Sequence, residues 1–533
     1  MEVITRESLQ LLAKRDISDG INAKFESDSQ RVDRFSFTLN DVYIDFSKTH
    51  ISEELLGLYE SFAKEINFED KRYQFLSGAR INTTENRAVL HTLLRDSTNQ
   101  GIDAEEPKFL EQARVAEEDF LNQYKRITEK LSQRAKPIKN IIHVGIGGSS
   151  LGTQLVFEAL GSVGCEINVH FISNIDAHKL VRVLNYCDPE TTLLIGVSKT
   201  FNTAETRQNI NTIGSWFEKY EVNDWLQQMF AVTSNPDNAI DFGVQESHVI
   251  GFPKWVGGRY SVWSAVSLSA AIAIGFDKFK EFLDGAASID KHFYSAELSN
   301  NVCFIAAALD HYYSNFLDVK SRAIFAYDHR LRSLISYLQQ LETESNGKDR
   351  QLDGVPVDQP TSVVVWGGVG TDVQHSVFQM MHQGTSLIPS EFILVKNPGH
   401  GYDDHHLELL ANGLAQTAAL LSGQDLETIS NIHKGKGLSD LELQAKVFSG
   451  ERPSTTMLVE SLTPHVLGSL LAFYEHRTFC SGIFANINSF DQMGVELGKR
   501  LAKEIKPLLT GRGDKSVHDF DGSTLGLLKK VKE

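Results

Sequence analysis

Short apolar segments of strand character recur along this 533-residue chain and alternate with segments of helical periodicity. Residues 140–147 (NIIHVGIG) form an apolar, β-branched run that glycine stops, which is typical of a strand buried on both faces. Similar runs occupy residues 167–173, 191–197, 322–328, 361–370 and 390–397. Strands that alternate with helices favour parallel sheets covered by helices. We therefore predict an α/β fold.

The strands fall into two blocks that resemble each other weakly. NIIHVGIGGSS and TSVVVWGGVGT both read as an apolar strand, a glycine loop and the start of a helix. This predicts two related, doubly wound α/β domains with mainly parallel sheets, with helical extensions at the N- and C-termini. In the N-terminal part, apolar spacing predicts a helix over 51–66, and an acidic helix is expected over 104–135. Asn82 stands three residues before Glu85, a capping-box pattern that predicts another helix start.

Charge and cysteine content exclude several classes of protein. Acidic residues outnumber basic ones by 69 to 52, a formal net charge of −17, which argues against a general binder of nucleic acid or anionic lipid. The four cysteines are scattered, so we expect neither a disulfide framework nor a cysteine-based zinc site. The charged N-terminus lacks a signal-peptide run, and the longest apolar run is too short to span a bilayer. We expect a cytoplasmic protein.

A glycine-rich loop at 145–152 follows the first predicted strand and opens a helix. Glycines let backbone N–H groups approach an anion, and the start of a helix adds positive potential. Two nucleotide fingerprints are incomplete, because Ser150 stands where the dinucleotide motif has glycine and Gly152-Thr153 where the P-loop has Gly-Lys. The loop is either an anion site or a tight strand–helix turn.

Residues 198–206 (SKTFNTAET) follow another predicted strand and bring three hydroxyls and a lysine to the start of a helix, which Asn202 and Glu205 mark as a capping box. Hydroxyl donors and helix N–H groups suit a phosphate monoester, although serine and threonine often only cap a helix. The position at the carboxyl end of a strand, where open α/β sheets bind ligands, favours the phosphate interpretation.

Two further segments carry candidate charged groups. The turn Gly257-Gly258-Arg259 can aim a guanidinium inward, toward either an anionic ligand or a buried structural carboxylate. An apolar stripe over 331–341 predicts a helix that ends near Asn346-Gly347. Glu344 then lies at the helix exit, where its carboxylate either faces a cleft or is simply solvated.

The remaining candidates are weaker. His382 lies near a predicted helix end, and Gln492 and Lys499 are seven residues apart, which would place them on one helix face. Residues 400–406 (HGYDDHH) contain metal-ligand residue types without the spacing of a helical zinc site. The tripeptide Arg512-Gly513-Asp514 is interpreted as a coincidence.

Together these motifs resemble the phosphoglucose isomerase family, from about residue 78 to the C-terminus. The matching motifs, in order, are GARINTTENRAVLH, GIGGSSLG, SKTFNTAET, GGRYSVWSA, LQQLETESNGK, QHSVFQMMHQGT, SFDQMGVELGK and HDFDGSTLGLL. The resemblance implies two three-layer αβα domains of the sugar-isomerase type. We expect the smaller domain at 105–275, the larger at 1–104 together with 276–500, and a helical tail at 501–533.

The resemblance also implies an activity, the interconversion of glucose 6-phosphate and fructose 6-phosphate in glycolysis and gluconeogenesis. Family members open the sugar ring and transfer a proton through a cis-enediolate, with no cofactor and no metal. They are homodimers whose active site is shared between subunits, and we expect no nucleic-acid or membrane partner.

Roles carry over residue by residue. Glu344 matches the base that moves a proton between C2 and C1, and Arg259 matches the residue that stabilises the enediolate. His382 and Lys499 match the pair that opens the ring, with His382 serving the neighbouring subunit. The matched substrate contacts are Ser149, Ser198, Lys199 through its backbone, Thr200 and Thr203 for the phosphate, with Gly148, Gln340 and Gln492 for the sugar or its phosphate.

Two other functions are weighed against this one. A phosphosugar-binding regulator without catalysis would need only the phosphate loops, whereas the four matched catalytic residues favour an enzyme. A nucleotide-dependent oxidoreductase is opposed by the incomplete glycine fingerprints.

Overall fold

The computed structural model describes residues 3–96, 108–161, 164–511 and 520–533. They form two compact units, one ending at Ser489 and the other beginning at Phe490. Both β-sheets lie in the first unit, and the second is helical. Among these described residues, no helix combines the length and the apolar character needed to cross a bilayer. The domain boundaries expected at 105, 275 and 500 stay predictions.

The first sheet has five parallel strands in the order β4-β3-β5-β6-β7. The strands are β3 (Asn140–Val144), β4 (Asn168–Ile172), β5 (Thr192–Val197), β6 (Met229–Thr233) and β7 (Val249–Gly251). The three strands predicted near 140, 167 and 191 are confirmed. Because β3 pairs directly with β5, the loops that follow these two strands leave the sheet side by side.

The second sheet has six strands in the order β1-β2-β11-β10-β8-β9. The strands are β1 (Ser36–Leu39), β2 (Val42–Asp45), β8 (Ser321–Tyr327), β9 (Val364–Val369), β10 (Ser390–Asn397) and β11 (Ser454–Ser461). Strands β8 to β11 pair in parallel, whereas β1 and β2 form an antiparallel hairpin that joins β11 at one edge. The mainly parallel character and the three strands predicted in this block are confirmed.

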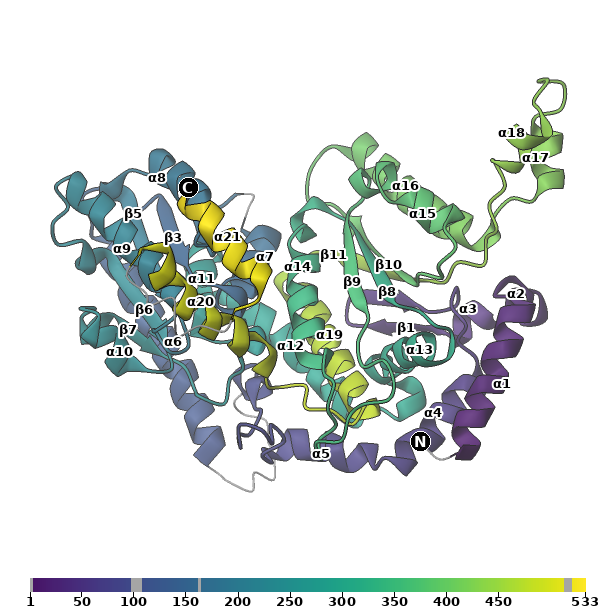
Figure 1. The fold of residues 1–533 in the computed structure, drawn as a ribbon, viewed down its shortest axis with the longest axis horizontal. Helices are drawn as coiled ribbons and strands as arrows, with labels where there is room; N and C mark the ends of the chain where they lie inside the picture. Colours follow the sequence, from purple (N-terminus) through teal and green to yellow (C-terminus); the bar gives the residue numbers. More distant parts are fainter. Residues whose placement is uncertain (1–2, 97–107, 162–163, 512–519) are drawn as a thin grey trace. The chain divides into compact units, whose positions relative to one another are not determined.

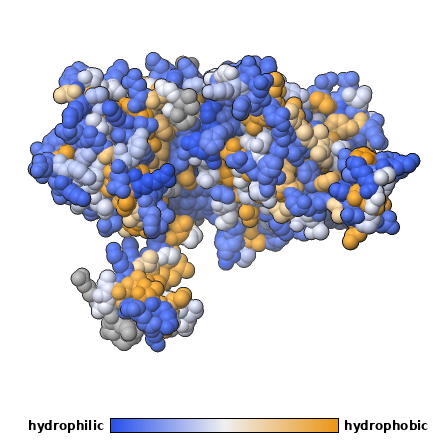
Figure 2. Space-filling view, turned by 90° about the horizontal axis from the view of Figure 1, so that it is seen from above, coloured by the Kyte–Doolittle hydropathy of each residue, from blue (hydrophilic) through white to orange (hydrophobic). Residues whose placement is uncertain are grey.

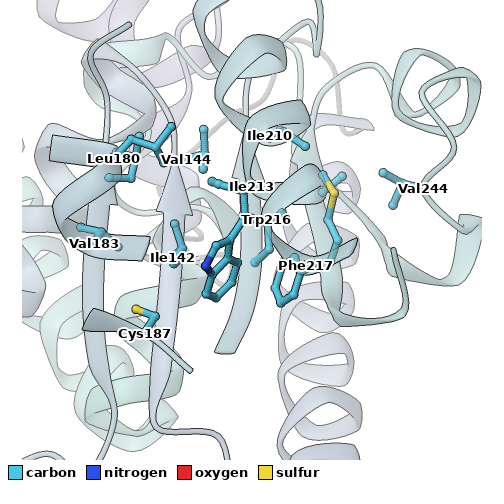
Figure 3. Packing of buried hydrophobic residues seen from close by; sticks show 14 of the residues in the cluster. Ile142, Val144, Leu180, Val183, Cys187, Ile210, Ile213, Trp216, Phe217 and Val244 are labelled. Atoms are coloured by element: carbon cyan, nitrogen blue, oxygen red, sulfur yellow. The ribbon is translucent and has the colours of Figure 1, made fainter. Parts of the chain in front are cut away.

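Helices cover both faces of the five-stranded sheet. On one face, α8 (Ala177–Tyr186) and α9 (Ala204–Lys219) bury a cluster that includes Ile142, Ile213 and Phe217, drawn in Figure 3. Side chains alternate along a strand, so His143 points to the other face, where its Nδ1 lies 2.7 Å from Ser269 Oγ of α11 (Leu268–Ile274). This gives the predicted three-layer arrangement.

The other helices complete the two units (Figure 1). They are α1 (Val3–Asp19), α2 (Asn22–Ser27), α3 (Arg31–Arg34), α4 (Glu53–Glu65), α5 (Phe68–Ser77), α6 (Lys108–Ser132), α7 (Leu151–Leu160), α10 (Pro236–Asp241), α12 (Phe276–Ser295), α13 (Val302–Phe316), α14 (Leu334–Gln339), α15 (Phe378–Gln383), α16 (Asp403–Ser422), α17 (Leu426–Ile432), α18 (Asp440–Gln444), α19 (Pro464–Phe484), α20 (Glu496–Leu509) and α21 (Gly522–Lys532). The helix predicted over 51–66 is confirmed. The helix predicted over 104–135 is confirmed for the residues that the structure describes, because α6 covers 108–132. Residues 104–107 of this prediction lie outside the described residues. The Arg512-Gly513-Asp514 tripeptide also lies outside them.

Two expected capping boxes do not form. Asn82 Nδ2 donates to Glu85 Oε2 at 2.9 Å, but the backbones of Asn82 and Arg87 pair with each other, which makes a tight turn in place of a helix start. After residues 198–203 the expected helix does form. However, α9 begins at Ala204, and its N-cap Thr203 makes no side-chain capping bond.

Candidate active site

Two polar loops lie at the carboxyl edge of the five-stranded sheet. Residues 145–150 follow β3 and residues 198–203 follow β5, and these strands pair in parallel with Val144 opposite Gly196. Open α/β sheets bind ligands at this edge, where helix N-termini and loop N–H groups converge. The topology therefore brings Ser149 and Ser198 to neighbouring loops, although they are far apart in sequence.

The loop after β5 gathers hydroxyl groups. Ser198 Oγ lies 3.1 Å from Thr203 Oγ1 and accepts a hydrogen bond from the N–H of Phe201 at 3.1 Å. Phe201 has φ +53°, which folds the loop back on itself, and the N–H of Asn202 donates to Thr200 Oγ1. Because Thr203 does not cap α9, the first N–H groups of this helix are left to other acceptors. This is a suitable site for an anion.

Lys199 adds a cation beside these hydroxyls. Its Nζ donates to the carbonyl of Val256 at 2.9 Å, while its own carbonyl accepts from Thr233 and Ser234. Burial, the largest cause, and the positive charges of Arg87 and Arg259 together lower the pKa of Lys199 to about 8, while Glu85 opposes them. A bound anion would stabilise this ammonium.

The glycine loop packs backbone to backbone against a second turn. A Cβ on Gly148 would lie 2.2 Å from both C and O of Gly258, which no side chain tolerates. The carbonyl of Gly148 accepts from Ser261 Oγ at 3.2 Å, and a Cβ on Gly147 would lie 3.0 Å from Gln340 Nε2. Glycine at 148 therefore lets the loop approach the turn that carries Arg259.

A buried histidine of β3 contacts the backbone of the same loop. His143 Nε2 lies 2.7 Å from the carbonyl oxygen of Ser149, and burial lowers the pKa of His143 to about 4. The ring is therefore neutral near pH 7. Since a carbonyl only accepts, Nε2 carries the proton and Nδ1 accepts from Ser269. Ser149 is thus held by its backbone, while its side chain is partly exposed.

Arg259 is held in place by hydrogen bonds and by a nearby carboxylate. It lies in the short turn η6 (Gly258–Tyr260) and is 3% exposed. Its Nε donates to Ser345 Oγ and its Nη2 to the carbonyl of Ser489, both at 2.7 Å, while Nη1 lies 3.7 Å from Glu344 Oε2. Tyr260 OH lies 2.8 Å from the same Ser345 hydroxyl. The guanidinium is therefore held in one orientation that faces Glu344.

Glu344 lies at a helix exit, as predicted. Helix α14 continues into η10 (Gln340–Glu344), a π-helical turn that was not predicted, and the helical backbone stops at Asn346. Gln340 Nε2 donates to Glu344 Oε2 at 2.9 Å. The Glu344 side chain retains 18% exposure, so it borders solvent while Arg259 does not. A carboxylate so placed can exchange a proton with a bound molecule.

Comparison with known proteins identifies the family. The sequence model of the family described as phosphoglucose isomerase matches residues 45–528. A glucose-6-phosphate isomerase of Novosphingobium aromaticivorans is 43% identical over 512 residues, which cover 95% of this chain and 94% of that protein. One of Francisella tularensis is 40% identical over 544 residues, covering 99% of each. The chain belongs to the phosphoglucose isomerase family.

The fold agrees with this family. The crystal structure of a glucose-6-phosphate isomerase from Chlamydia trachomatis matches with a TM-score of 0.84 at 29% identity, covering 99% of this chain and 98% of that one. The two mainly parallel sheets predicted for this chain therefore match a solved member of the family over almost the whole chain.

His382 lies apart from the Arg259–Glu344 pair. It sits in α15, beside α16 in Figure 1 and away from α14, and its Nε2 lies 2.9 Å from Gln416 Oε1. The ring also packs edge-on against Phe448, with ring centroids 5.6 Å apart. Within one subunit, His382 therefore contacts Gln416 of α16, Phe448 after α18 and Phe378 of its own helix.

Gln492 and Lys499 belong to the second unit. Lys499 lies in α20, where its Nζ contacts Glu496 Oε1 at 2.9 Å. The prediction that the two residues share one helix face is wrong. Helix α20 begins only at Glu496, and Gln492 lies before the short turn η12 (Met493–Val495).

Sequence reasoning missed the groups that orient the arginine. Ser345 is completely buried and joins Arg259 Nε to Tyr260 OH, and the Ser489 carbonyl holds Nη2. Ser345 directly follows Glu344, and Tyr260 directly follows Arg259, so adjacency was the one available signal. The Ser489 carbonyl has no sequence signal, since any residue supplies one.

Proposed function

We propose that this chain is an aldose–ketose isomerase that interconverts D-glucose 6-phosphate and D-fructose 6-phosphate. Family membership and the glucose-6-phosphate isomerases that match its full length support this activity. The observation that carries the proposed mechanism is the partly exposed Glu344 carboxylate beside the buried Arg259 guanidinium.

The phosphate binds at the two loops of the five-stranded sheet. The hydroxyls of Ser149, Ser198, Thr200 and Thr203 and the backbone of Lys199 hold it, with the start of α9 supplying positive potential. Binding energy gained at the phosphate, remote from the reacting carbons, holds C1 and C2 against the base.

Glu344 takes the proton from C2 and returns it to C1. The cis-enediolate formed between these steps carries new negative charge, which Arg259 stabilises more than it stabilises the substrate. Since Ser345 and Ser489 already fix the guanidinium, little reorganisation is needed when the charge develops.

Ring opening precedes proton transfer. His382 and Lys499 exchange protons with the ring oxygen and the C1 hydroxyl, and Gly148, Gln340 and Gln492 contact the sugar or its phosphate. The position of Gln340 supports its role, because its amide already bonds to Glu344. The reaction moves one proton from C2 to C1 and one from the C2 hydroxyl to the oxygen on C1, so it needs neither a cofactor nor a metal.

The active form is a homodimer in which His382 serves the partner subunit. Two observations support this: within its own subunit His382 contacts Gln416, Phe378 and Phe448 rather than Arg259 or Glu344, and apolar side chains are exposed on the neighbouring helices. In Figure 2 the segment carrying α17 and α18 lies at the right-hand end with apolar surface in view. The exposed apolar residues on α16 to α18 are Leu407, Leu414, Leu426, Ile432 and Leu441.

Two further assignments complete the proposal. The five-stranded and six-stranded sheets are the cores of the smaller and larger sugar-isomerase domains. The enzyme works in the cytoplasm, as the four free cysteines, of which three are buried, suit a reducing compartment.

Turnover of fructose 6-phosphate tests the proposed function. Glucose 6-phosphate formed in the presence of EDTA is read through a glucose-6-phosphate dehydrogenase couple. Glu344→Gln should lower kcat by at least ~10²-fold, because general-base catalysis is lost. The matched control Glu460→Gln, at an exposed glutamate of β11, should keep the wild-type kcat.

Several outcomes would contradict the proposal. Absence of turnover by the wild-type protein, or loss of turnover with EDTA, would overturn the metal-independent isomerase. A near-wild-type kcat in Glu344→Gln would remove that residue as the base. Binding of NAD in a calorimetric titration would favour the oxidoreductase, and sugar-phosphate binding without turnover would favour the regulator.

A further inference from the structure

Two residues before Glu344, the π-helical turn η10 sends Glu342 into a buried charge cluster. We define the cluster by its five members, Asp310, Arg322, Glu342, Glu391 and Arg477. They come from α13, β8, η10, β10 and α19 respectively. The cluster thus joins the turn that carries Glu344 to two adjacent strands and two helices of the same unit.

Arg322 is the centre of this cluster. Its Nη2 contacts both oxygens of Glu342, at 2.6 and 2.7 Å, while Nη1 donates to Asp310 at 2.7 Å. Its Nε lies 3.1 Å from Glu391 Oε1. The Arg322 side chain is 3% exposed, so solvent screens these contacts little.

Arg477 completes the cluster. This guanidinium donates to both oxygens of Asp310 and to Glu391, at 2.6 to 2.7 Å. Burial raises the pKa of Glu342 while Arg322 and Arg477 lower it. Moving Glu342 away from Arg322 would leave buried charges without their partners, which costs free energy. The cluster therefore opposes displacement of Glu342.

The turn η10 is held from both ends. At its start, Gln339 Nε2 donates to the carbonyl of Val365 on β9, and at its end Lys348 Nζ donates to the carbonyl of Glu344. Between these points, Glu342 is the side chain of the turn that bonds to the strand β8. Glu344, two residues later in the same turn, is instead partly exposed and lies 3.7 Å from Arg259.

We propose that Arg322 and Glu342 are positioning residues that fix η10, so that the Glu344 carboxylate stays opposite Arg259. This rests on the proposed function, in which Glu344 is the base. Releasing Glu342 lets the turn shift, and proton transfer slows because a small displacement of a base from the reacting carbon lowers the rate strongly.

Two glutamine variants within the cluster separate positioning from stability. Glu342→Gln weakens the bond of η10 to Arg322, whereas the matched control Glu391→Gln removes a carboxylate of the same Arg322 from the strand β10. For each we would measure kcat, KM, the urea midpoint and the primary isotope effect with glucose 6-phosphate deuterated at C2. The isotope effect is measured because partial unfolding lowers kcat but does not change the isotope effect.

Glu342→Gln should lower kcat by at least ~10-fold with KM within about twofold, and raise the isotope effect as proton transfer becomes slower than the other steps. Glu391→Gln should lower the urea midpoint to a similar degree and keep the wild-type kcat and isotope effect. If Glu342→Gln does not fold, Glu342→Asp keeps the charge, displaces the turn and is measured in the same way.

Equal losses of kcat in the two variants, or an unchanged isotope effect in Glu342→Gln, would overturn the positioning role. The Glu344→Gln variant distinguishes this failure from failure of the proposed function. If Glu344→Gln is inactive and Glu342→Gln behaves as wild type, only the positioning role is wrong. If Glu344→Gln is active, the assignment of the base is wrong.

Discussion

The Nη1 atom of Arg259 lies 3.7 Å from Oε2 of Glu344, close enough for strong attraction and too far for a hydrogen bond. Two other contacts of Arg259, to Ser345 and the Ser489 carbonyl, are at 2.7 Å. These two neutral groups help to anchor the guanidinium, which presents its charge to the carboxylate. Such a pair suits a reaction in which negative charge appears on the substrate between them.

Arg259→Ala should lower kcat by at least ~10²-fold while KM rises much less, because the arginine stabilises the enediolate more than the substrate. Steady-state kinetics in both reaction directions checks this. The control Ser345→Ala removes one anchor and keeps the guanidinium, so its loss of kcat should be smaller. A rise in KM at constant kcat would make Arg259 an anchor of the ground state.

Gly148→Ala should displace the phosphate loop, because the added Cβ would lie 2.2 Å from the Gly258 carbonyl. We expect a destabilisation of roughly 1–3 kcal/mol, as for other overpacked sites, together with a fall in kcat/KM of at least ~10-fold. Thermal unfolding and steady-state kinetics measure the two effects.

The control for this substitution is Gly251→Ala, where an added Cβ meets nothing within 4 Å. It should leave both the unfolding temperature and kcat/KM close to the wild-type values. If Gly148→Ala also behaves as wild type, the close approach of the two loops is not needed for activity.

Much of the fold could be predicted because buried parallel strands have a simple sequence signature. Residues 193–197 (LLIGV) carry no polar side chain, and all of β5 is buried. The hairpin β1–β2 was missed, since only two of its eight residues are buried and its pattern also fits a loop. The second sheet therefore has an antiparallel edge that apolar runs alone could not reveal.

In the candidate site, too, some features could be predicted from the sequence and others could not. A leucine stripe predicted the helix that presents Glu344, but nothing in it specifies the π-helical turn, whose contacts come from β8, β9 and the turn at Arg259. Likewise, spacing placed Gln492 on a helix face. The helix begins four residues later, and a seven-residue interval contains no information on where it starts. Local patterns predict elements, whereas side-chain orientation depends on distant partners.

Acid should destabilise this protein through its buried neutral histidines. Burial lowers the pKa of His50 and His143 to about 4 and that of His311 to about 3. The unfolded chain binds protons at these residues below about pH 6.5, whereas the folded chain does not until about pH 4. The free energy of unfolding is therefore unaffected by these groups above pH 6.5 and falls as the pH drops toward 4, by up to roughly 3 kcal/mol for His143.

Urea unfolding at several pH values between 7 and 5 checks this pH dependence. His143→Asn should reduce its slope, because one titrating group is removed. The control His178→Asn, at an almost fully exposed ring, should leave the slope as in wild type. An identical slope in His143→Asn would show that His143 does not titrate differently in the folded and unfolded states.

Mixed dimers test whether His382 serves the partner subunit. Glu344→Gln and His382→Ala should each be nearly inactive alone. In a heterodimer of the two, one site combines the intact Glu344 of one subunit with the intact His382 of the other, and the second site lacks both. Random reassociation of equal amounts makes half of the dimers heterodimers, so about one quarter of wild-type activity should return. Mixing without subunit exchange is the control and should restore nothing. If the exchanged mixture also stays inactive while heterodimers are detected by mass spectrometry, His382 acts within its own subunit or outside the site.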